Sequence, residues 1–489
     1  MLHTYTICAI STAQGGAIGV IRVSGPEAID AASRIFTPMH GKPLHERPHY
    51  TLTFGKIHAT DGEVIDEVLV SLFRAPHSYT GEDSVEISCH GSTYILQQVM
   101  SRLIENGCRL AQPGEYTQRA FLNGKMDLSQ AEAVADLIAS TSAATHRLAM
   151  NQMRGGFSKE LSTLRDKLLH LTSLMELELD FSDHEELEFA DRSELSQIAS
   201  DIERTVSRLA HSFSVGNAIK NGVPVAIIGE TNVGKSTLLN ALLGEERAIV
   251  SDIHGTTRDV IEDTVNLRGI TFRFIDTAGI RQTTDVVESI GIKRTYQKMS
   301  QASIVLWMID AESTTVPLFI EGRAQCNEAE GVPSEARSFS FSNSSLFTLH
   351  SSLEGKKLLL LFNKADRITP EEREALLQSY AHVDAPKLFI SAKSRTGLEE
   401  LETLLVNTAA LPEVSQSDVI VTNLRHYEAL VRALDSIHRV QDGLQTGLSG
   451  DFISQDLREC LSHLAEIVGG AFDVEDVLGN IFKHFCIGK

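Results

Sequence analysis

The sequence predicts a multidomain fold: an α+β domain first, then an all-α domain in two parts with an α/β domain inserted between them. Three observations support this prediction. The chain has 489 residues, a length that corresponds to several domains of ordinary size. The stretches 114–223 and 413–489 contain none of the twelve prolines, as expected of long helices. Between them, short β-rich runs alternate with helical segments, the pattern of an α/β sheet.

Residues 1–120 are predicted to form the α+β domain. Three strand-like runs, 18–23, 68–73 and 84–88, accompany one helical segment near 92–106. This mixture of strands with few helices is typical of a sheet with helices on one face.

The all-α domain is predicted to comprise residues 121–216 and 412–489. Each part has an apolar stripe with steps of three and four residues, which is helical spacing. The first stripe is Leu161, Leu164, Leu168, Leu171 and Met175, and the second is Ile453, Leu457, Leu461, Leu464 and Val468. Each stripe must be covered, and the simplest expectation is that the two cover each other.

Residues 217–411 are predicted to form the inserted α/β domain with a parallel sheet. The expected strands are 225–228, 271–275, 304–309, 358–362 and 388–390. A segment rich in Ser and Thr near 311–355 shows little periodicity and is interpreted as a surface insertion.

The composition limits the classes of function. The chain is 42% hydrophobic, which is typical of globular domains, and 44 Lys+Arg against 65 Asp+Glu give a net charge of −21. That charge argues against a broad basic surface for nucleic acid, although a local basic site remains compatible with it. Residues 176–194 hold nine acidic residues and one Arg; we interpret them as a solvated helix face, with a partner-facing surface as the alternative.

The cysteines and the chain start point to a cytoplasmic protein. Six scattered cysteines form no C-x-x-C pair, so reduced thiols are expected rather than a zinc site. The first residues lack the pattern of a secretory leader, and no apolar run is long enough to span a membrane.

A phosphate-binding motif opens the inserted domain. Gly229-Glu-Thr-Asn-Val-Gly-Lys-Ser236 matches G-x-x-x-x-G-K-[ST] between a predicted strand and a predicted helix. The backbone N–H groups of such a turn cradle phosphates, while Lys235 can reach the β- and γ-phosphates and Ser236 can bind Mg²⁺.

Four further motifs follow in order, three of them at the carboxyl ends of predicted strands. Asp276-Thr-Ala-Gly279 can hold a magnesium-bound water and contact the γ-phosphate, and Thr257 in the loop 256–259 is the expected second magnesium ligand. In Asn363-Lys-Ala-Asp366 the carboxylate can accept both hydrogen bonds from the amino edge of guanine, which adenine lacks, and Ser391-Ala-Lys393 can contact the guanine carbonyl. Ligands bind at this edge of such sheets. The predicted fold is therefore a P-loop GTPase domain, with a GTP-binding set of Asn232, Val233, Gly234, Lys235, Ser236, Thr237, Ser251, Thr256, Thr257, Asp276, Thr277, Ala278, Gly279, Asn363, Lys364, Asp366, Ser391 and Ala392.

The residue that orients the attacking water in Ras-like enzymes is missing. Ile280 stands where those enzymes have Gln, and an apolar side chain cannot orient water. The nearby candidates for this role are Asn232, Arg258, Arg281 and Glu288, although the two arginines are equally compatible with a solvated surface.

Taken together, these motifs resemble the MnmE (TrmE) family of tRNA-modification GTPases over nearly the whole chain. The resemblance is carried by 21–25, 79–83, 113–125, 127–138 and the terminal Phe485-Cys-Ile-Gly-Lys489. It implies an N-terminal tetrahydrofolate-binding domain that forms a homodimer. It also implies a flavoprotein partner, MnmG (GidA), which alone carries FAD. Together the two would add an aminomethyl-type group (carboxymethylaminomethyl) to carbon 5 of the wobble uridine of tRNA, with 5-formyl- or methylene-tetrahydrofolate as the one-carbon source.

The same resemblance assigns further site residues. It implies a potassium ion, held by Asn232, Ser251, Ile253 and Thr256, that replaces an arginine finger when two GTPase domains meet. Glu288 would position the water, acting with Lys235 and Asn232 as the catalytic residues. The folate residues implied are Arg22, Glu86, Lys125 and Lys489.

The chain departs from the family pattern near the folate residues. Cys89-His-Gly-Ser92 stands where the family more often has Gly-His-Gly-Gly, and the 311–355 segment is longer than expected. Cys486 is either a reactive thiol near the folate or a packing residue.

Two other functions are compatible with the GTPase motifs. One is an RNA-binding GTPase of ribosome assembly, although the chain ends in helical, proline-free sequence rather than a basic RNA-binding module. The other is a GTP-switched scaffold that hydrolyses GTP too slowly for catalysis to matter, against which Glu288 and the potassium loop argue.

Overall fold

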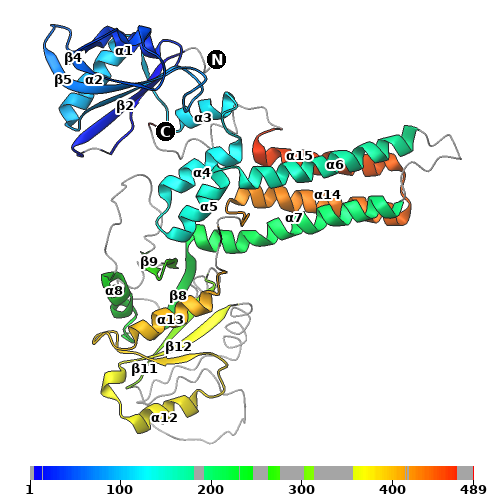
Figure 1. Ribbon diagram of the computed structural model, residues 1–489. Helices are drawn as coiled ribbons and strands as arrows, with labels where there is room; N and C mark the ends of the chain where they lie inside the picture. The colour runs from blue at the N-terminus through cyan, green and yellow to red at the C-terminus, as the bar shows by residue number, and fades with distance from the viewer. Residues whose placement is uncertain are drawn as a thin grey trace, which may run out of the picture. The chain divides into compact units, whose positions relative to one another are not determined.

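The structure is a computed structural model that describes residues 5–13, 15–180, 192–230, 232–245, 263–275, 302–312, 356–412, 415, 418–470 and 488 (Figure 1). The Cα packing divides the chain into two compact units. Unit 1 comprises 1–141, 146–213 and 415–489, and unit 2 comprises 142–145 and 214–414. The finer division of the chain at residues 120, 216 and 411 stays a prediction.

The N-terminal part of unit 1 is a seven-stranded sheet in the order β3-β4-β5-β6-β2-β1-β7. Its strands are β1 (Ile7–Ile10), β2 (Ile18–Ser24), β3 (Phe36–Pro38), β4 (Thr51–His58), β5 (Val64–Phe73), β6 (Ser84–His90) and β7 (Arg109–Leu110). Helices α1 (Ala28–Ile35) and α2 (Thr93–Glu105) bury their apolar sides against the sheet in one core. The expected strands 18–23, 68–73 and 84–88 and the helix near 92–106 are confirmed.

The other face of this sheet exposes apolar side chains. Phe54 and Leu69 are cross-strand partners on β4 and β5, and Leu52 lies two residues before Phe54. Their side chains are 46%, 40% and 62% exposed. These three side chains form an exposed apolar group on this face of the sheet.

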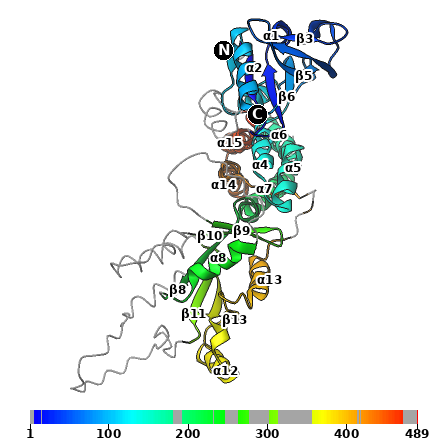
Figure 2. The ribbon, with the colours of Figure 1, turned by 90° about the vertical axis from the view of Figure 1, so that its left-hand side faces the viewer.

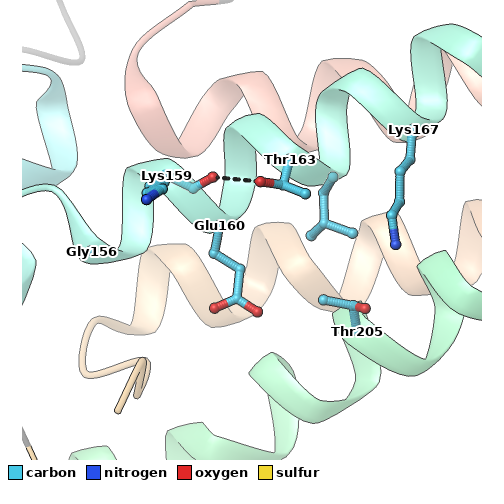
Figure 3. A pocket seen from close by; sticks show the side chains of 7 residues that line it. Gly156, Lys159, Glu160, Thr163, Lys167 and Thr205 are labelled. Carbon is cyan, nitrogen blue, oxygen red and sulfur yellow. Dashed lines mark hydrogen bonds between the residues drawn. The ribbon is translucent and has the colours of Figure 1, made fainter. Parts of the chain in front are cut away.

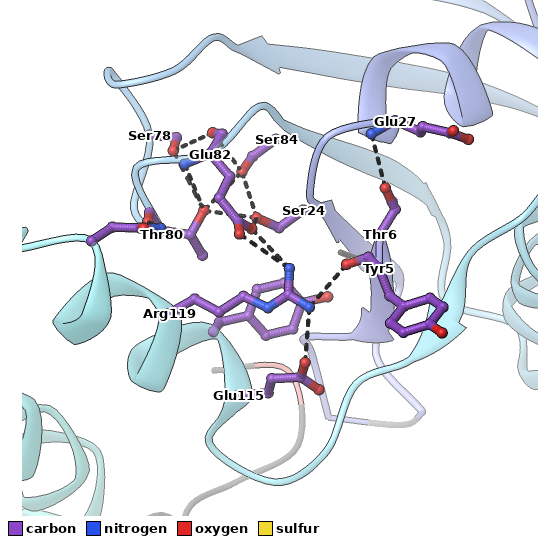
Figure 4. Close-up of polar contacts among 12 residues, drawn as sticks. Tyr5, Thr6, Ser24, Glu27, Ser78, Thr80, Glu82, Ser84, Glu115 and Arg119 are labelled. Carbon is purple, nitrogen blue, oxygen red and sulfur yellow. Dashed lines mark hydrogen bonds and ion pairs between the residues drawn. The ribbon is translucent and has the colours of Figure 1, made fainter. Parts of the chain in front are cut away.

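A buried ionic network joins this sheet to α3 (Glu115–Leu122) (Figure 4). The Arg119 guanidinium is 1% exposed and donates to Glu82 (3.0 and 3.2 Å), to Glu115 (2.9 Å) and to the Tyr5 carbonyl (2.9 Å). Burial alone would raise the pKa of Glu115, but hydrogen bonds from Arg109, the Gln112 backbone N–H and Arg119 together lower it. Arg119 thus links three segments far apart in the sequence.

The helical part of unit 1 is a bundle. Its helices are α4 (Leu128–Ala139), α5 (Ala143–Met153), α6 (Gly156–Asp180), α7 (Arg192–Asn221), α14 (Leu424–Thr446) and α15 (Gly450–Val468). The long helices α6, α7, α14 and α15 run side by side in both views (Figure 1, Figure 2). In the described part of the chain, none of the helices is both long enough and apolar enough to cross a membrane.

The two predicted apolar stripes do cover each other. Residues 161, 164, 168, 171 and 175 share one buried core with 453, 457 and 464, and 461 and 468 pack against it. Of the acidic segment 176–194, residues 181–191 and the side chains of 177–192 lie outside the description.

A second ionic cluster ties the two parts of the bundle together. Arg425, at the start of α14, bonds Glu132 of α4 (3.0 and 3.2 Å) and donates to the carbonyl oxygens of Glu466 and Ile467 at the end of α15. His426, fully buried, lies 2.7 Å from the same Glu132 carboxylate. Burial alone would raise the pKa of Glu132, but His426 first and then Arg425 lower it.

Unit 2 is a six-stranded sheet in the order β13-β12-β11-β8-β10-β9. Its strands are β8 (Val223–Gly229), β9 (Asp263–Leu267), β10 (Ile270–Phe274), β11 (Ile304–Asp310), β12 (Lys357–Asn363) and β13 (Lys387–Phe389). The expectation of a wholly parallel sheet is corrected at its edge, because β9 runs antiparallel to β10. The two-residue turn Arg268-Gly269 joins them, and both residues have positive φ, as in a tight hairpin.

Helices cover both faces of this sheet. Helices α8 (Lys235–Glu245) and α13 (Leu398–Ala409) pack on one face, where Leu359 and Leu361 of β12 point. Helix α12 (Pro370–Ser379) lies on the other face with Leu360 and Phe362. Of the predicted 311–355 insertion, residues 313–355 lie outside the description.

Candidate functional site

The phosphate-binding motif forms the turn between β8 and α8. Gly229 has φ +147° and Gly234 has φ +102°, values that favour glycine. A Cβ on Gly229 would lie 2.4 Å from the Met308 carbonyl oxygen, and one on Gly234 would lie 2.3 Å from Asn363 Nδ2. The turn needs glycine at both positions because it passes close to β11 and β12.

Lys235 and Ser236 begin α8, where backbone N–H groups are not used by the helix. The Lys235 ammonium donates to the carbonyl oxygens of Gly229 (2.8 Å) and Glu230 (2.5 Å) of its own turn. The helix N-terminus and the ammonium together provide a site for a polyphosphate.

Asn363 joins the phosphate side of the site to the base side. Its side chain is buried, its Nδ2 donates to the Val233 carbonyl (2.7 Å), and its Oδ1 accepts from the Ala392 backbone N–H (3.0 Å). One amide side chain therefore fixes the phosphate turn and the 391–393 segment in a single arrangement.

Asp366 lies on the turn Ala365–Arg367 after β12, with its carboxylate 40% exposed. A hydrogen bond with Ser391 is the main cause that lowers the pKa of Asp366, and the charges of Arg367 and Lys393 lower it further. The carboxylate is therefore ionised at neutral pH and can accept hydrogen bonds from a base.

These groups surround one cavity of about 380 Å³, a volume within the usual range for small-molecule sites. Its lining combines residues of the phosphate turn with residues that follow β12 and β13. They are Asn232, Gly234, Thr237, Asn363, Lys364, Asp366, Arg367, Ser391 and Lys393. The cavity combines a helix N-terminus for phosphates with an ionised carboxylate for a base.

Of the predicted nucleotide residues, those on β8–α8, β12 and the segment after β13 are brought together. The remaining ones lie outside the described residues: Ser251, Ile253, Thr256, Thr257, Asp276, Thr277, Ala278, Gly279 and Glu288, with Arg258, Ile280 and Arg281. Arg367 was not predicted; its position directly after Asp366 was the only signal in the sequence.

A second polar cluster lies in the N-terminal sheet. Arg22 on β2 and Glu86 on β6 are cross-strand partners, and their side chains are bonded at 2.8–2.9 Å. The Arg22 guanidinium faces the rings of Tyr79 (5.6 Å) and Tyr116 (5.7 Å). The carbonyl of Gly488 accepts from Ser11 Oγ (3.2 Å) and lies 3.5 Å from Arg22 Nη1. The residue before the chain terminus therefore contacts this cluster.

Lys125 lies beside the loop that carries Tyr79. Its ammonium donates to the Pro76 carbonyl (2.9 Å), and its stem lies within 3.3 Å of the position that a Cβ on Gly81 would occupy. Arg22 and Lys125 thus both contact the loop 76–81, Arg22 through the Tyr79 ring and Lys125 through the Pro76 carbonyl, while Lys489 and Cys486 lie outside the described residues.

The 89–92 departure keeps the backbone close approach that its glycine needs. A Cβ on Gly91 would lie 1.9 Å from the Gly16 carbonyl oxygen. Burial raises the pKa of the Cys89 thiol to about 11, so this group is the protonated thiol and not the nucleophilic thiolate at neutral pH. His90 is held by Asp66 through its ring (2.7 Å) and its backbone N–H (2.8 Å), which fits a structural role.

A further cavity of about 370 Å³ lies between α6 and α7 (Figure 3). It is lined by Gly156, Lys159, Glu160, Thr163, Leu164, Lys167 and Thr205. Within the part of the chain that the structure describes, no cluster of three His, Cys, Asp or Glu side chains suits a metal. No predicted site residue lines this cavity.

Two family models match the chain. The MnmE helical-domain model matches residues 128–486, and the model of the N-terminus of GTP-binding protein TrmE matches residues 6–125. Among solved structures, the G domain of the T. maritima FeoB iron transporter is 26% identical over 38% of this chain and 98% of its own. Its TM-score is 0.23, so the fold described here rests on the sheet topology and not on that match.

Full-length curated relatives are similar from end to end. A tRNA modification GTPase MnmE from Phocaeicola vulgatus is 62% identical over 522 residues and covers all of both chains. The protein of the same name from Bacteroides thetaiotaomicron is 64% identical over 488 residues, covering 99% of each chain. That from Flavobacterium johnsoniae is 50% identical over 493 residues, covering all of each.

Proposed function

The chain belongs to the MnmE family of tRNA modification GTPases, and on that premise we propose that it binds GTP in the cavity at the carboxyl edge of the unit 2 sheet. The observation that carries this proposal is Asn363, which bonds both the phosphate turn and the Ala392 N–H beside the ionised Asp366. Asp366 would accept the two N–H donors of guanine, and the Ala392 segment would face the guanine carbonyl. Ser236 and Thr257 would hold Mg²⁺, which supplies positive charge beside the phosphates.

We propose that K⁺ supports hydrolysis where Ras-like enzymes use Gln and an arginine finger. Asn232 is exposed and lines the cavity, and it has a left-handed backbone with φ +64°. Asn232 with Ser251, Ile253 and Thr256 would hold the ion, and Glu288 would position the water. The ion supplies positive charge where negative charge develops on the phosphates.

The expected result is GTP hydrolysis faster in potassium than in sodium buffer by about tenfold or more, equivalent to about 1.4 kcal/mol of barrier. Because two GTPase domains must meet, the rate per molecule should also rise with protein concentration in potassium. Phosphate release at matched ionic strength measures both effects. Asn232→Gly keeps the positive φ accessible and should remove the difference between the two salts. Equal rates for the unaltered protein in both salts would contradict the potassium assignment.

We propose that the N-terminal sheet binds a tetrahydrofolate at Arg22, Glu86, Lys125 and Lys489. The donor set fits the group: a carboxylate suits the amino edge of a pterin, cationic side chains suit the folate carboxylates, and Tyr79 offers a ring face. Contact of Gly488 with Ser11 and Arg22 supports the inclusion of the terminal residue. When bound, the folate supplies the one-carbon unit. The exposed Leu52, Phe54 and Leu69 support a homodimer through this domain.

Calorimetry with a formyl-tetrahydrofolate tests this site. The unaltered protein should show binding, and Arg22→Ala should weaken it by about tenfold to a hundredfold, because a charge-assisted hydrogen bond contributes about 1.5–3 kcal/mol. Arg34→Ala is the matched control, since Arg34 donates to the Asn106 carbonyl (3.3 Å) at the surface and is not one of the proposed folate residues. Absence of heat with the unaltered protein would refute the folate site.

We propose that the complete reaction is the addition of an aminomethyl-type group, carboxymethylaminomethyl, to carbon 5 of the wobble uridine of tRNA in the cytoplasm. The flavoprotein MnmG would be the partner and would carry the FAD. With a net charge of −21, this chain is expected to leave much of the grip on tRNA phosphates to that partner. Loss of the modification in a strain without this chain is the expected result.

A further inference from the structure

Two acidic side chains lie behind the base side of the proposed GTP site. Asp310 is the last residue of β11, and its register partner on β12 is Asn363. Lys364, the next residue, forms an ion pair with Asp310 and lies 3.8 Å from Glu312. Glu312 also bonds the Arg367 guanidinium at 3.0 and 3.2 Å. Each acid therefore holds one of the two cations that flank Asp366 in the sequence.

The acids and the cations occupy different places relative to the cavity. Lys364 and Arg367 line it, whereas Asp310 and Glu312 do not. The Asp310 carboxylate is held by the backbone: the Glu312 N–H donates to Asp310 Oδ1 (3.1 Å), and Asp310 Oδ2 pairs with Lys364. Because Asp310 and Glu312 do not line the cavity, they can affect a bound nucleotide only through Lys364 and Arg367.

Lys364 needs such an anchor. It has a left-handed backbone (φ +65°) and a partly buried side chain, 29% exposed, so pinning the ammonium at Asp310 lays its methylene stem along the cavity wall. A released ammonium two residues from Asp366 would be drawn to that carboxylate, because opposite charges at short range attract strongly near a protein surface. The carboxylate would then be occupied when the base arrives.

We propose that Asp310 and Glu312 are positioning residues of the guanine site. Asp310 holds Lys364 away from Asp366 so that the carboxylate stays available to the base, and Glu312 fixes Arg367, whose Nε lies 4.0 Å from that carboxylate, so that Arg367 comes no closer. This inference rests on the proposed GTP site. The sequence motifs include neither residue, because Asp310 ends β11 and Glu312 follows it, between the phosphate and guanine motifs.

The test measures the affinity of the full chain for a fluorescent GDP analogue. Asp310→Asn should raise the dissociation constant about tenfold, since it removes a charge-assisted hydrogen bond partner from Lys364. It should raise KM for GTP equally while kcat at saturation stays unchanged. Glu312→Gln, on the more exposed pair, should raise the dissociation constant about threefold. Asp384→Asn is the matched control, because it removes the same negative charge from an exposed residue of unit 2.

A double-variant comparison separates positioning from a merely structural effect. If Asp310 acts through Lys364, then Asp310→Asn combined with Lys364→Met should bind GDP as Lys364→Met alone does. The fluorescence of Trp307, on β11 itself, reports whether the sheet stays folded. The inference would be overturned if Asp310→Asn bound the GDP analogue as tightly as the unaltered protein does. It would also be overturned if the fold-changes in the dissociation constant for Asp310→Asn and Lys364→Met multiplied in the double variant. If the unaltered protein bound no GDP, the proposed GTP site itself would fail instead.

Discussion

Asp366→Asn should lower the affinity for guanine nucleotides by a hundredfold to a thousandfold. The Asp366 carboxylate would accept two hydrogen bonds from guanine, and each charge-assisted bond contributes about 1.5–3 kcal/mol. The asparagine amide keeps one acceptor but presents an N–H group to the exocyclic amine of guanine, so one bond is replaced by a clash of donors. The loss is large because the carboxylate is ionised: its hydrogen bond with Ser391 and the charges of Arg367 and Lys393 lower the pKa of Asp366.

The same substitution should favour xanthine nucleotides. Xanthine carries an oxygen in place of the amine, so the asparagine N–H gains an acceptor. Competition of GDP and xanthosine diphosphate against a fluorescent GDP analogue measures the exchange of preference. Asp384→Asn controls for the lost charge. An unchanged preference for GDP would refute the guanine role of Asp366.

Arg119→Met should destabilise unit 1 by about 3–5 kcal/mol, the usual cost of breaking a buried ion pair. Methionine keeps the length of the stem but removes the donors to Glu82, Glu115 and the Tyr5 carbonyl (Figure 4). The Glu82 carboxylate, 13% exposed, then keeps its partly buried position without this cation. Arg204→Met is the matched control: Arg204 is 73% exposed and pairs with Asp201, so the change should cost about 0–1 kcal/mol.

The destabilisation should shrink as the solution becomes acidic. The folded-state pKa of Glu115 is lowered, so its contribution to stability is present above the unfolded pKa and is lost as pH falls through the folded pKa. Once the carboxyls are protonated, Arg119 has less to stabilise. Far-ultraviolet circular dichroism during urea unfolding follows the helices, whereas the single Trp, Trp307, follows only unit 2. A midpoint for Arg119→Met equal to that of Arg204→Met at neutral pH would contradict the role of Arg119.

The sequence was most informative in unit 2, because most residues of its site lie in short contiguous motifs. The glycines at 229 and 234, the lysine at 235 and the asparagine at 363 each have a local reason that the structure shows in distances. The antiparallel β9 was missed, since a short alternating run followed by Arg268-Gly269 gives a weak hairpin signal. Asp310 was missed because its partner lies across strands rather than along the chain.

The N-terminal domain was less accessible to sequence reasoning. β4 was missed because Leu52 and Phe54 point away from the core while Ile57 points into it, which blurs the alternation of a half-buried strand. The folate residues could not be found from spacing: Arg22 and Glu86 become partners only through the register of β2 and β6, 64 residues apart in the sequence. Only the resemblance to a family indicated them.

The helical bundle could be predicted from the sequence in part. Periodicity alone identified the stripes on α6 and α15, because buried apolar positions on a helix recur every three or four residues. The polar link between the two parts could not be predicted: Glu132 and Arg425 are 293 residues apart. Such long-range ion pairs depend on the whole topology, which local patterns do not encode.

We expect this chain to modify the wobble uridine of tRNA in a reaction that requires its GTPase site. Mass spectrometry of wobble uridines tests it most directly, in a strain lacking the chain and complemented with either the unaltered gene or the Asp366→Asn variant. The deletion strain should lack the aminomethyl-type group, the unaltered gene should restore it, and the variant should not. Normal modification in the deletion strain would refute the role in tRNA modification and favour a GTPase of ribosome assembly.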